Sequence, residues 1–157
     1  MSDWIERLKE RKAEERRNEA EREKAQQRKH ELIQSMLPEF VARTSERIAK
    51  DVLKLRETFP NEGRYDLRFQ AQEPGFSVGN SSGLGTFHVG ISMDPTQTIL
   101  RARTVRNDLN SGPQPNTIEI PVELDVKDKL LVTFGGERFY RPEEFAEALV
   151  KYVLNAG

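Results

Sequence analysis

The sequence contains no cysteine among its 157 residues. This absence excludes disulfide bonds, thiol nucleophiles and cysteine-ligated zinc or iron–sulfur centres. Long apolar runs are also lacking, because no stretch approaches the about 18 residues that a membrane-spanning helix needs. The first residues have no apolar segment of the kind found in signal peptides. We therefore expect a cytoplasmic protein that does not associate with a membrane.

An excess of charge of one sign is missing as well. The formal net charge is -1, and residues 1–58 carry 15 basic and 13 acidic side chains, whereas the remainder carries 10 and 13. Neither part has the charge that would indicate a polyanionic partner. The only two histidines, His30 and His88, are far apart in the sequence, and a metal site needs clustered ligands. We predict no metal, no cofactor and no catalytic residue.

The N-terminal part is almost devoid of large apolar side chains. Residues 3–30 consist mainly of Glu, Lys, Arg, Gln and Ala, without Gly or Pro, and these residue types favour a helix. Opposite charges at spacings of three and four, such as Arg11 with Glu15, stabilise helices by about 0.2–0.5 kcal/mol per pair. A helix that is polar on all sides is exposed to solvent or bridges between bodies. We predict an exposed, charged helical arm over residues 1–34.

Apolar residues return at Leu32 and then recur at helical spacing as far as Phe59. This period predicts an amphipathic helix over residues 37–58. Pro38 conflicts with a continuous helix, because proline in a helix interior costs about 3 kcal/mol or more. We therefore predict a kink or break near residues 35–38, where Ser35 can cap a new helix.

Residues 64–141 change to a period of two, which predicts β-strands. Turn signals divide this region into six or seven strands of a mainly antiparallel sheet, and the longest irregular stretch is expected at residues 107–116. Pro121 cannot donate a ladder hydrogen bond, which favours an edge strand. Residues 142–155 form a C-terminal helix with Pro142 in its first turn. Residues 35–157 are thus predicted to form one α+β domain.

Two segments resemble chemical sites only superficially. The glycine-rich segment 79–86 lacks the lysine and the following helix of a phosphate-binding loop, so we interpret it as a hairpin loop. His88 lies on the polar side of its predicted strand, and nothing in the sequence places a nucleophile or carboxylate beside it. An acid–base role requires such a partner. We interpret His88 as a histidine at the surface or at its boundary.

Arginines mark a second candidate surface. Arg101 and Arg103 are two residues apart and therefore share one face of a strand. If Arg68 and Arg138 also face outward, a basic surface results that could contact phosphates or an acidic peptide. Acidic residues also alternate outward in the same region, so a mixed-charge sheet face is favoured over nucleic-acid binding. These acidic residues are Asp66, Glu73, Glu119 and Glu123.

Trp4, Ile5 and Leu8 form an apolar cluster near the end of the polar arm. Such a cluster is either an incidental feature of a frayed terminus or a knob that a partner receives. From it we predict a non-enzymatic interaction or assembly module that forms homodimers through the arm, or that binds another protein. Two alternatives remain open. One is a nucleic-acid-associated protein, and the other is a small-molecule binder or enzyme with a pocket lined by residues such as Phe87, His88, Arg101 and Tyr140.

Overall fold

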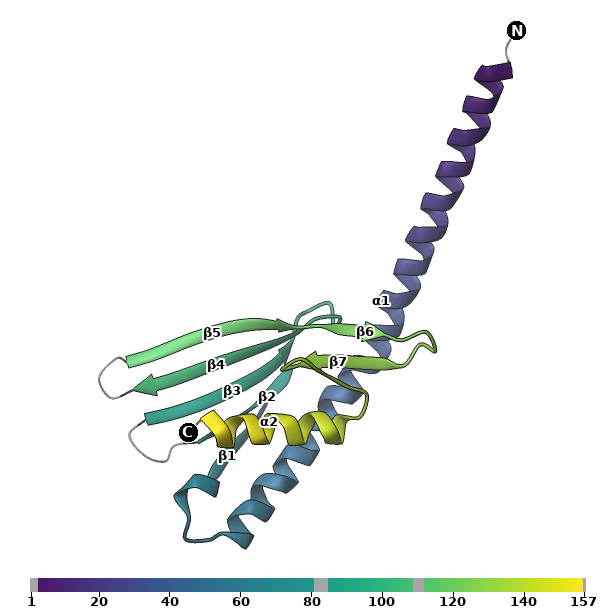
Figure 1. The fold of residues 1–157 in the computed structure, drawn as a ribbon. Helices are drawn as coiled ribbons and strands as arrows, with labels where there is room; N and C mark the ends of the chain where they lie inside the picture. The colour runs from purple at the N-terminus through teal and green to yellow at the C-terminus, as the bar shows by residue number, and fades with distance from the viewer. Residues whose placement is uncertain (1–2, 81–84, 109–111, 157) are drawn as a thin grey trace. The chain divides into compact units, whose positions relative to one another are not determined.

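A computed structural model describes residues 3–80, 85–108 and 112–156. Within these residues the chain forms two α-helices, one short 3-10 helix (Gly63–Tyr65) and eight β-strands (Figure 1). The long helix α1 spans Asp3–Thr58 and the C-terminal helix α2 spans Pro142–Ala156. This confirms the α+β class, with a helix at each end of the strand region. The chain divides into two units, Met1–Leu32 and Ile33–Gly157.

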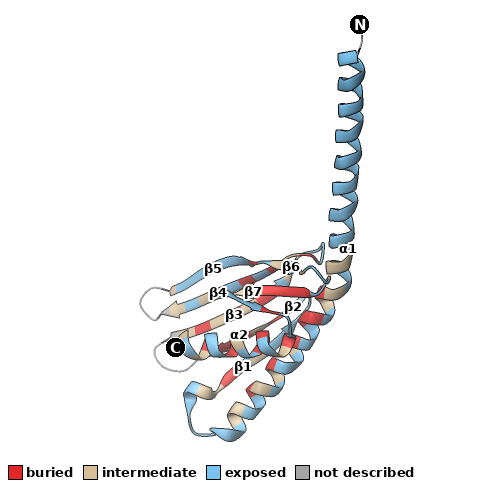
Figure 2. Cartoon of the chain, turned by 45° about the vertical axis from the view of Figure 1, so that its right-hand side comes forward, coloured by how far each residue is buried: buried red, intermediate tan, exposed pale blue. Residues whose placement is uncertain are grey.

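The first unit is a single stretch of α1. Every residue from Asp3 to Glu31 is helical and exposed, and Figure 2 shows this stretch in pale blue throughout. The composition explains the helix, since strong helix formers follow one another without Gly or Pro. The predicted pairing of Arg11 with Glu15 is absent from the ion pairs among the described residues. The helix is therefore held by its backbone and by local contacts such as Gln27 with Glu31, whose side chains lie 3.3 Å apart.

In the second unit, α1 turns an apolar stripe toward the core. Its buried residues are Leu37, Phe40, Val41, Thr44, Ile48 and Val52. The helix continues through Pro38, so the predicted break at residues 35–38 does not occur, and the alternative of a kink there stays a prediction. Leu37 and Phe40 on either side of the proline are buried, and burial of such side chains contributes about 1.5–3 kcal/mol each. This tertiary packing offsets the local cost of proline.

The larger sheet has five strands, and each strand pairs with the next one in antiparallel orientation. Consecutive strands that pair in this way form a meander. The strands are β1 (Leu67–Gln72), β2 (Gly75–Asn80), β3 (Gly85–Met93), β4 (Leu100–Asp108) and β5 (Gly112–Ile120). The segment 79–86 thus belongs to a β2–β3 hairpin, as predicted, although residues 81–84 lie outside the described part.

A second sheet has three antiparallel strands, β6 (Val122–Leu124), β7 (Leu130–Phe134) and β8 (Glu137–Phe139). The described residues therefore form eight strands in two sheets, where the sequence predicted six or seven strands in one. Pro121 lies between β5 and β6, at the point where the chain passes from one sheet to the other. Proline has no N–H to donate, but the Pro121 carbonyl accepts a hydrogen bond from the N–H of Thr133 in β7 at 3.0 Å. Pro121 therefore separates two edge strands rather than lying within one.

The predicted irregular stretch at residues 107–116 is wrong for residues 107–108 and 112–116, and its residues 109–111 lie outside the described part. Strand β4 extends to Asp108 and β5 begins at Gly112, with Pro113 opposite Asn107 and Pro115 opposite Val105. Strand β5 is an edge strand of its sheet. An edge position tolerates proline, because one side of the strand makes no ladder bonds. The tertiary position of the strand thus overrides the local turn signal.

The core lies between one face of the five-stranded sheet, the smaller sheet and the helical residues of the second unit. The buried apolar side chains of β2, β3 and β4 alternate along each strand, and α2 contacts β2, β3 and β8 (Figures 1 and 2). Phe145 of α2 is at the centre of an aromatic cluster, with ring centroids 5.9 Å from Phe40, 6.0 Å from Phe134 and 5.9 Å from Phe139. We call the opposite side of the five-stranded sheet its outer face.

Candidate functional site

The outer face presents the residues that alternate with the buried ones. The strand register places them in three rows across β1 to β5. In the second and third rows the β2 and β3 positions are Gly or Ser and longer polar side chains stand on β1 and β4, whereas the first row has His88 on β3 and Val105 on β4. The rows are Arg68–Gly79–His88–Val105–Pro115, Gln70–Ser77–Gly90–Arg103–Thr117 and Gln72–Gly75–Ser92–Arg101–Glu119.

Arg101 and Arg103 lie together on this face, as the sequence predicted. Both side chains are exposed, and neither belongs to an ion pair within the described ranges. Arg68 is different, because its Nη2 lies 3.6 Å from Asp66 Oδ2. Arg101 and Arg103 are therefore the guanidinium groups of the outer face that are best placed to meet an external anion.

The expected mixture of charges on this face is present only in part. Of the four acidic residues considered, Glu119 alone lies on a described strand of the outer face, where it is opposite Arg101. Glu123 belongs to β6 of the other sheet, Glu73 to the turn between β1 and β2, and Asp66 precedes β1. Arg138 is likewise on the other sheet, in β8. The outer face is consequently more basic than the sequence indicated.

The charge of Arg101 also acts on Asp94, in the turn between β3 and β4. Asp94 accepts hydrogen bonds from Thr96 Oγ1 at 2.8 Å and from the backbone N–H of Ile99 at 3.2 Å. Desolvation raises the pKa of Asp94, but these hydrogen bonds, one from the backbone of Thr98 and the charge of Arg101 together hold the pKa below its ordinary value. The carboxylate of Asp94 is therefore held by hydrogen bonds within its own turn and stays ionised near neutral pH.

His88 has a packing role on the same face. It lies opposite Gly79 in the β2–β3 register, and its ring occupies the space that a side chain at Gly79 would fill. No group of three possible metal ligands occurs in the parts of the chain that the structure describes. His88 is half-buried, so its ring lies at the boundary of the surface, against the backbone of β2.

The outer face also has an apolar end that sequence reasoning missed. Val105 is half-buried, and Pro113 and Pro115 follow on β5. These residues were assigned largely to an irregular stretch, which concealed their common face. A spacing of two in the sequence joins Pro113 to Pro115, and the same spacing joins Arg101, Arg103 and Val105. This alternation was the sequence signal for one common face.

The predicted arm cluster is exposed in the first unit. Trp4, Ile5 and Leu8 have 65%, 50% and 41% of their surface accessible. Trp4 and Leu8 are four residues apart and Ile5 and Leu8 three apart, so the three side chains share one side of the helix. These side chains are thus an exposed apolar group on an otherwise polar stretch of helix.

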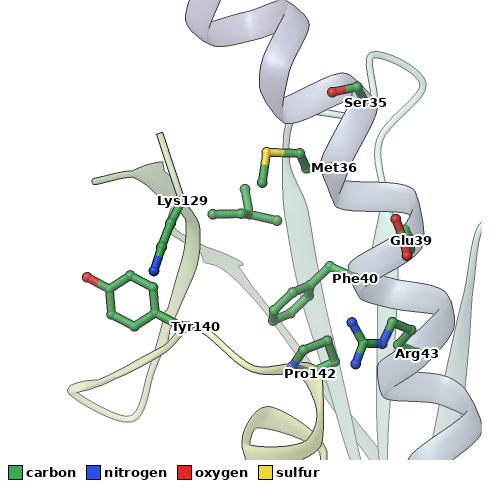
Figure 3. Close-up of a pocket in the computed structure, with 9 residues that line it drawn as sticks. Ser35, Met36, Glu39, Phe40, Arg43, Lys129, Tyr140 and Pro142 are labelled. Atoms are coloured by element: carbon green, nitrogen blue, oxygen red, sulfur yellow. The ribbon is translucent and has the colours of Figure 1, made fainter. Parts of the chain in front are cut away.

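A cavity of about 310 Å³ lies between α1 and the segment around Tyr140. Met36 and Phe40 extend from α1 toward Lys129 and Tyr140, and Arg43 lies near Pro142 (Figure 3). Arg43 Nη2 donates a hydrogen bond at 2.8 Å to Glu143 Oε1. With its guanidinium engaged in this way, Arg43 ties α1 to α2 beside the cavity.

The pocket considered for a small molecule does not form. Phe87 faces the core side, where its ring lies 5.6 Å from that of Tyr152. His88 and Arg101 are on the outer face, and Tyr140 lines the separate cavity described above. Successive residues of a strand point to opposite faces, so Phe87 and His88 cannot line one pocket.

Comparisons with known proteins complete the description of the site. No family model, curated protein or solved structure matches this chain. None of the helices in the described segments carries an apolar stretch that could cross a bilayer. The fold thus defines an α+β protein with a helical arm, and its candidate functional surfaces are the outer face and the exposed apolar group of the arm.

Proposed function

We propose that this chain is a non-enzymatic protein-interaction and assembly module that forms homo-oligomers through its N-terminal arm. The observation that carries the proposal is the exposure of the whole helix from Asp3 to Glu31, with Trp4, Ile5 and Leu8 accessible near its end. Burying side chains of this size stabilises an interface by about 1.5–3 kcal/mol each. A second chain that covers them would give this helix the packed partner that it lacks within its own unit.

Charge favours a second copy of the chain as the partner. Residues 1–32 carry 10 basic and 9 acidic side chains, so the arm has no net charge that would select a strongly charged macromolecule. The whole chain is also nearly neutral. Contact between two copies therefore meets little long-range repulsion, and two-fold dimers are the commonest closed assemblies.

Sedimentation velocity of the full chain tests this proposal. We expect a dimer whose mass falls to that of a monomer for Trp4→Ser/Leu8→Ser and for a shortened chain that begins at residue 31. Every residue of the core lies after position 36, so the shortened chain keeps its core. A matched control, Ala13→Ser/Ala20→Ser, alters the polar part of the arm and leaves the dimer intact. A monomeric full chain at micromolar concentration would reject the proposal.

Nucleic-acid binding is a second candidate, favoured by the exposed Arg101 and Arg103. Proteins that bind single strands combine such cations with aromatic rings on which bases stack. The described residues of the outer face include no Phe, Tyr or Trp. Fluorescence anisotropy with labelled single-stranded and duplex oligonucleotides at low salt decides between the two candidates. Binding that weakens steeply with salt and is lost in Arg101→Glu/Arg103→Glu would favour nucleic acid.

A further inference from the structure

A row of carboxylates follows the apolar cluster along the arm. Glu15, Glu19 and Glu23 succeed one another at intervals of four residues, so they line one side of the helix at a rise of about 6 Å per step. Like charges at this spacing are unfavourable in an isolated helix. None of the three carboxylates forms an ion pair within the described part of the chain. A basic surface that covers the row would remove this repulsion.

The acidic row shares its helix side with the apolar cluster. Trp4, Leu8, Glu15 and Glu19 are separated by four, seven and four residues, and these spacings return to the same side of a helix. A second row, Glu6, Glu10 and Glu14, lies on another side. One side of the arm therefore has an apolar end and an acidic end, which we call the docking side.

The outer face of β4 has the complementary pattern. Arg101 and Arg103 form its basic end, and Val105, with Pro115 opposite it, forms its apolar end. Alternate residues of a strand are about 6.7 Å apart, close to the about 6 Å between Glu15 and Glu19. Leu8 lies about 10 Å beyond Glu15 along the helix. Val105 and Asn107 lie about 7 and 13 Å beyond Arg103, so Leu8 reaches the apolar end when Glu15 meets Arg103.

The neighbouring strands leave room for a helix along β4. On β3, Gly90 and Ser92 lie opposite Arg103 and Arg101 and carry little or no side chain. A Cβ at Gly90 would have no atom closer than 3.8 Å, so the space above this residue is open. On β5, Glu119 lies opposite Arg101. An arm that places Glu19 on Arg101 carries Arg22, three residues further along on the same side of the helix, toward Glu119.

We propose that the arm of one copy lies antiparallel along β4 of a second copy, with Glu15 on Arg103, Glu19 on Arg101 and Leu8 beside Val105. This inference rests on the proposed function and names its receiving surface. Guanidinium groups bind carboxylates through paired hydrogen bonds of fixed geometry, so the charged end sets the register. The apolar end stabilises the contact through the burial of Leu8 against Val105. Reciprocal exchange of two arms gives a closed dimer.

Charge reversal on the full chain tests the surface. Arg101→Glu/Arg103→Glu and Glu15→Arg/Glu19→Arg should each weaken the dimer at least about tenfold, since each places like charges in contact. An equimolar mixture of the two variants restores both contacts in a reciprocal dimer, so we expect it to form heterodimers of nearly wild-type affinity. The matched controls are Glu10→Arg/Glu14→Arg, on another side of the arm, and Arg138→Glu/Arg141→Glu, outside the outer face. Both controls should dimerise like the wild type.

The outcomes separate this inference from the function on which it rests. A dimer that withstands both charge reversals but is lost in Trp4→Ser/Leu8→Ser overturns the receiving surface and leaves assembly through the arm in place. A mixture that binds no better than its two components also overturns the direct pairing of these residues. A monomeric wild-type chain overturns both proposals. Circular dichroism of each variant shows that the lost affinity does not come from unfolding.

Discussion

The imidazole of His88 lies over the α-carbon of Gly79 on the neighbouring strand. A Cβ built on Gly79 would come within 1.9 Å of Nδ1 of His88 and within 2.8 Å of its Cγ. The two residues are directly opposite each other in the β2–β3 register. Glycine therefore provides the space in which the ring packs, and the ring covers backbone that would otherwise be open to solvent.

This relationship predicts that Gly79→Ala destabilises the protein. The added methyl group must displace the ring near its base, and overpacking of this kind typically costs about 1–3 kcal/mol. Urea unfolding monitored by circular dichroism measures the change in the free energy of unfolding. The double variant Gly79→Ala/His88→Ala should recover most of the loss, because the obstructing ring is gone.

Gly90→Ala is the matched control for this substitution. Gly90 lies on the same face, but a Cβ there would have its nearest neighbours at 3.8 and 3.9 Å, which is ordinary contact. Alanine also restricts the unfolded chain more than glycine does, so stability should stay the same or rise by less than about 1 kcal/mol. Equal losses for Gly79→Ala and Gly90→Ala would contradict the packing role of His88.

Phe145→Ala should be the most damaging of the substitutions considered. Its ring is 1% exposed and joins Phe40 of α1 to rings of the smaller sheet. Truncation of a buried phenylalanine costs about 3–5 kcal/mol, a large fraction of the stability of a domain this size. Phe59→Ala removes a 37% exposed ring stacked on Tyr65. We expect it to cost less than Phe145→Ala, with about 0.5–1.5 kcal/mol from the lost stacking beyond its partial burial. Thermal unfolding of both variants compares the two.

Periodicity in the sequence was sufficient to predict most of the elements but not their pairing. The period of two across residues 64–141 and the apolar period of α1 and α2 depend on local spacing, and the structure confirms both. The division into two sheets depends instead on which distant strands pair, and Pro121 marks the division without specifying it. The strands at residues 107–116 were missed because proline is a turn signal locally, and its edge position is a property of the whole sheet.

The candidate site on the outer face was likewise predictable where it depends on local spacing and not where it depends on distant pairing. Placing Arg101 and Arg103 on one face required only their spacing of two. The loss of Glu123 and Arg138 from that face could not be predicted, because it depends on the second sheet. The proposed grouping of Phe87 with His88 contradicted the alternation of a strand and was avoidable from the sequence.

Pro38→Ala should stabilise the protein. Pro38 lies inside α1 and cannot donate the backbone hydrogen bond that another residue would give to the carbonyl of Gln34. Alanine restores this donor, and the helix propensities differ by about 3 kcal/mol. Because the surrounding residues already accommodate the proline, we expect a gain of about 1–3 kcal/mol in urea unfolding. Glu39→Ala, at the exposed next position, should change stability by less than about 0.5 kcal/mol. A loss of stability in Pro38→Ala would show that α1 is adapted to the proline ring.

Asp125 makes stability depend on pH through the turn between β6 and β7. Its Oδ1 accepts hydrogen bonds from the N–H groups of Lys129 at 2.9 Å and Lys127 at 2.8 Å. The hydrogen bond from Lys129 is the main reason that the pKa of Asp125 lies below its ordinary value. Desolvation raises this pKa, but the hydrogen bond from Lys127 and the charges of both lysines lower it further. A carboxyl group whose pKa is lower in the folded than in the unfolded state stabilises the protein above its unfolded pKa, and this stabilisation is lost as the pH falls through the folded pKa. Asp125→Ala should therefore be less stable than the wild type at pH 7, and the difference should shrink as urea unfolding is repeated below pH 4. A difference that stays constant down to pH 2 would show that the ionised carboxylate contributes nothing to this turn.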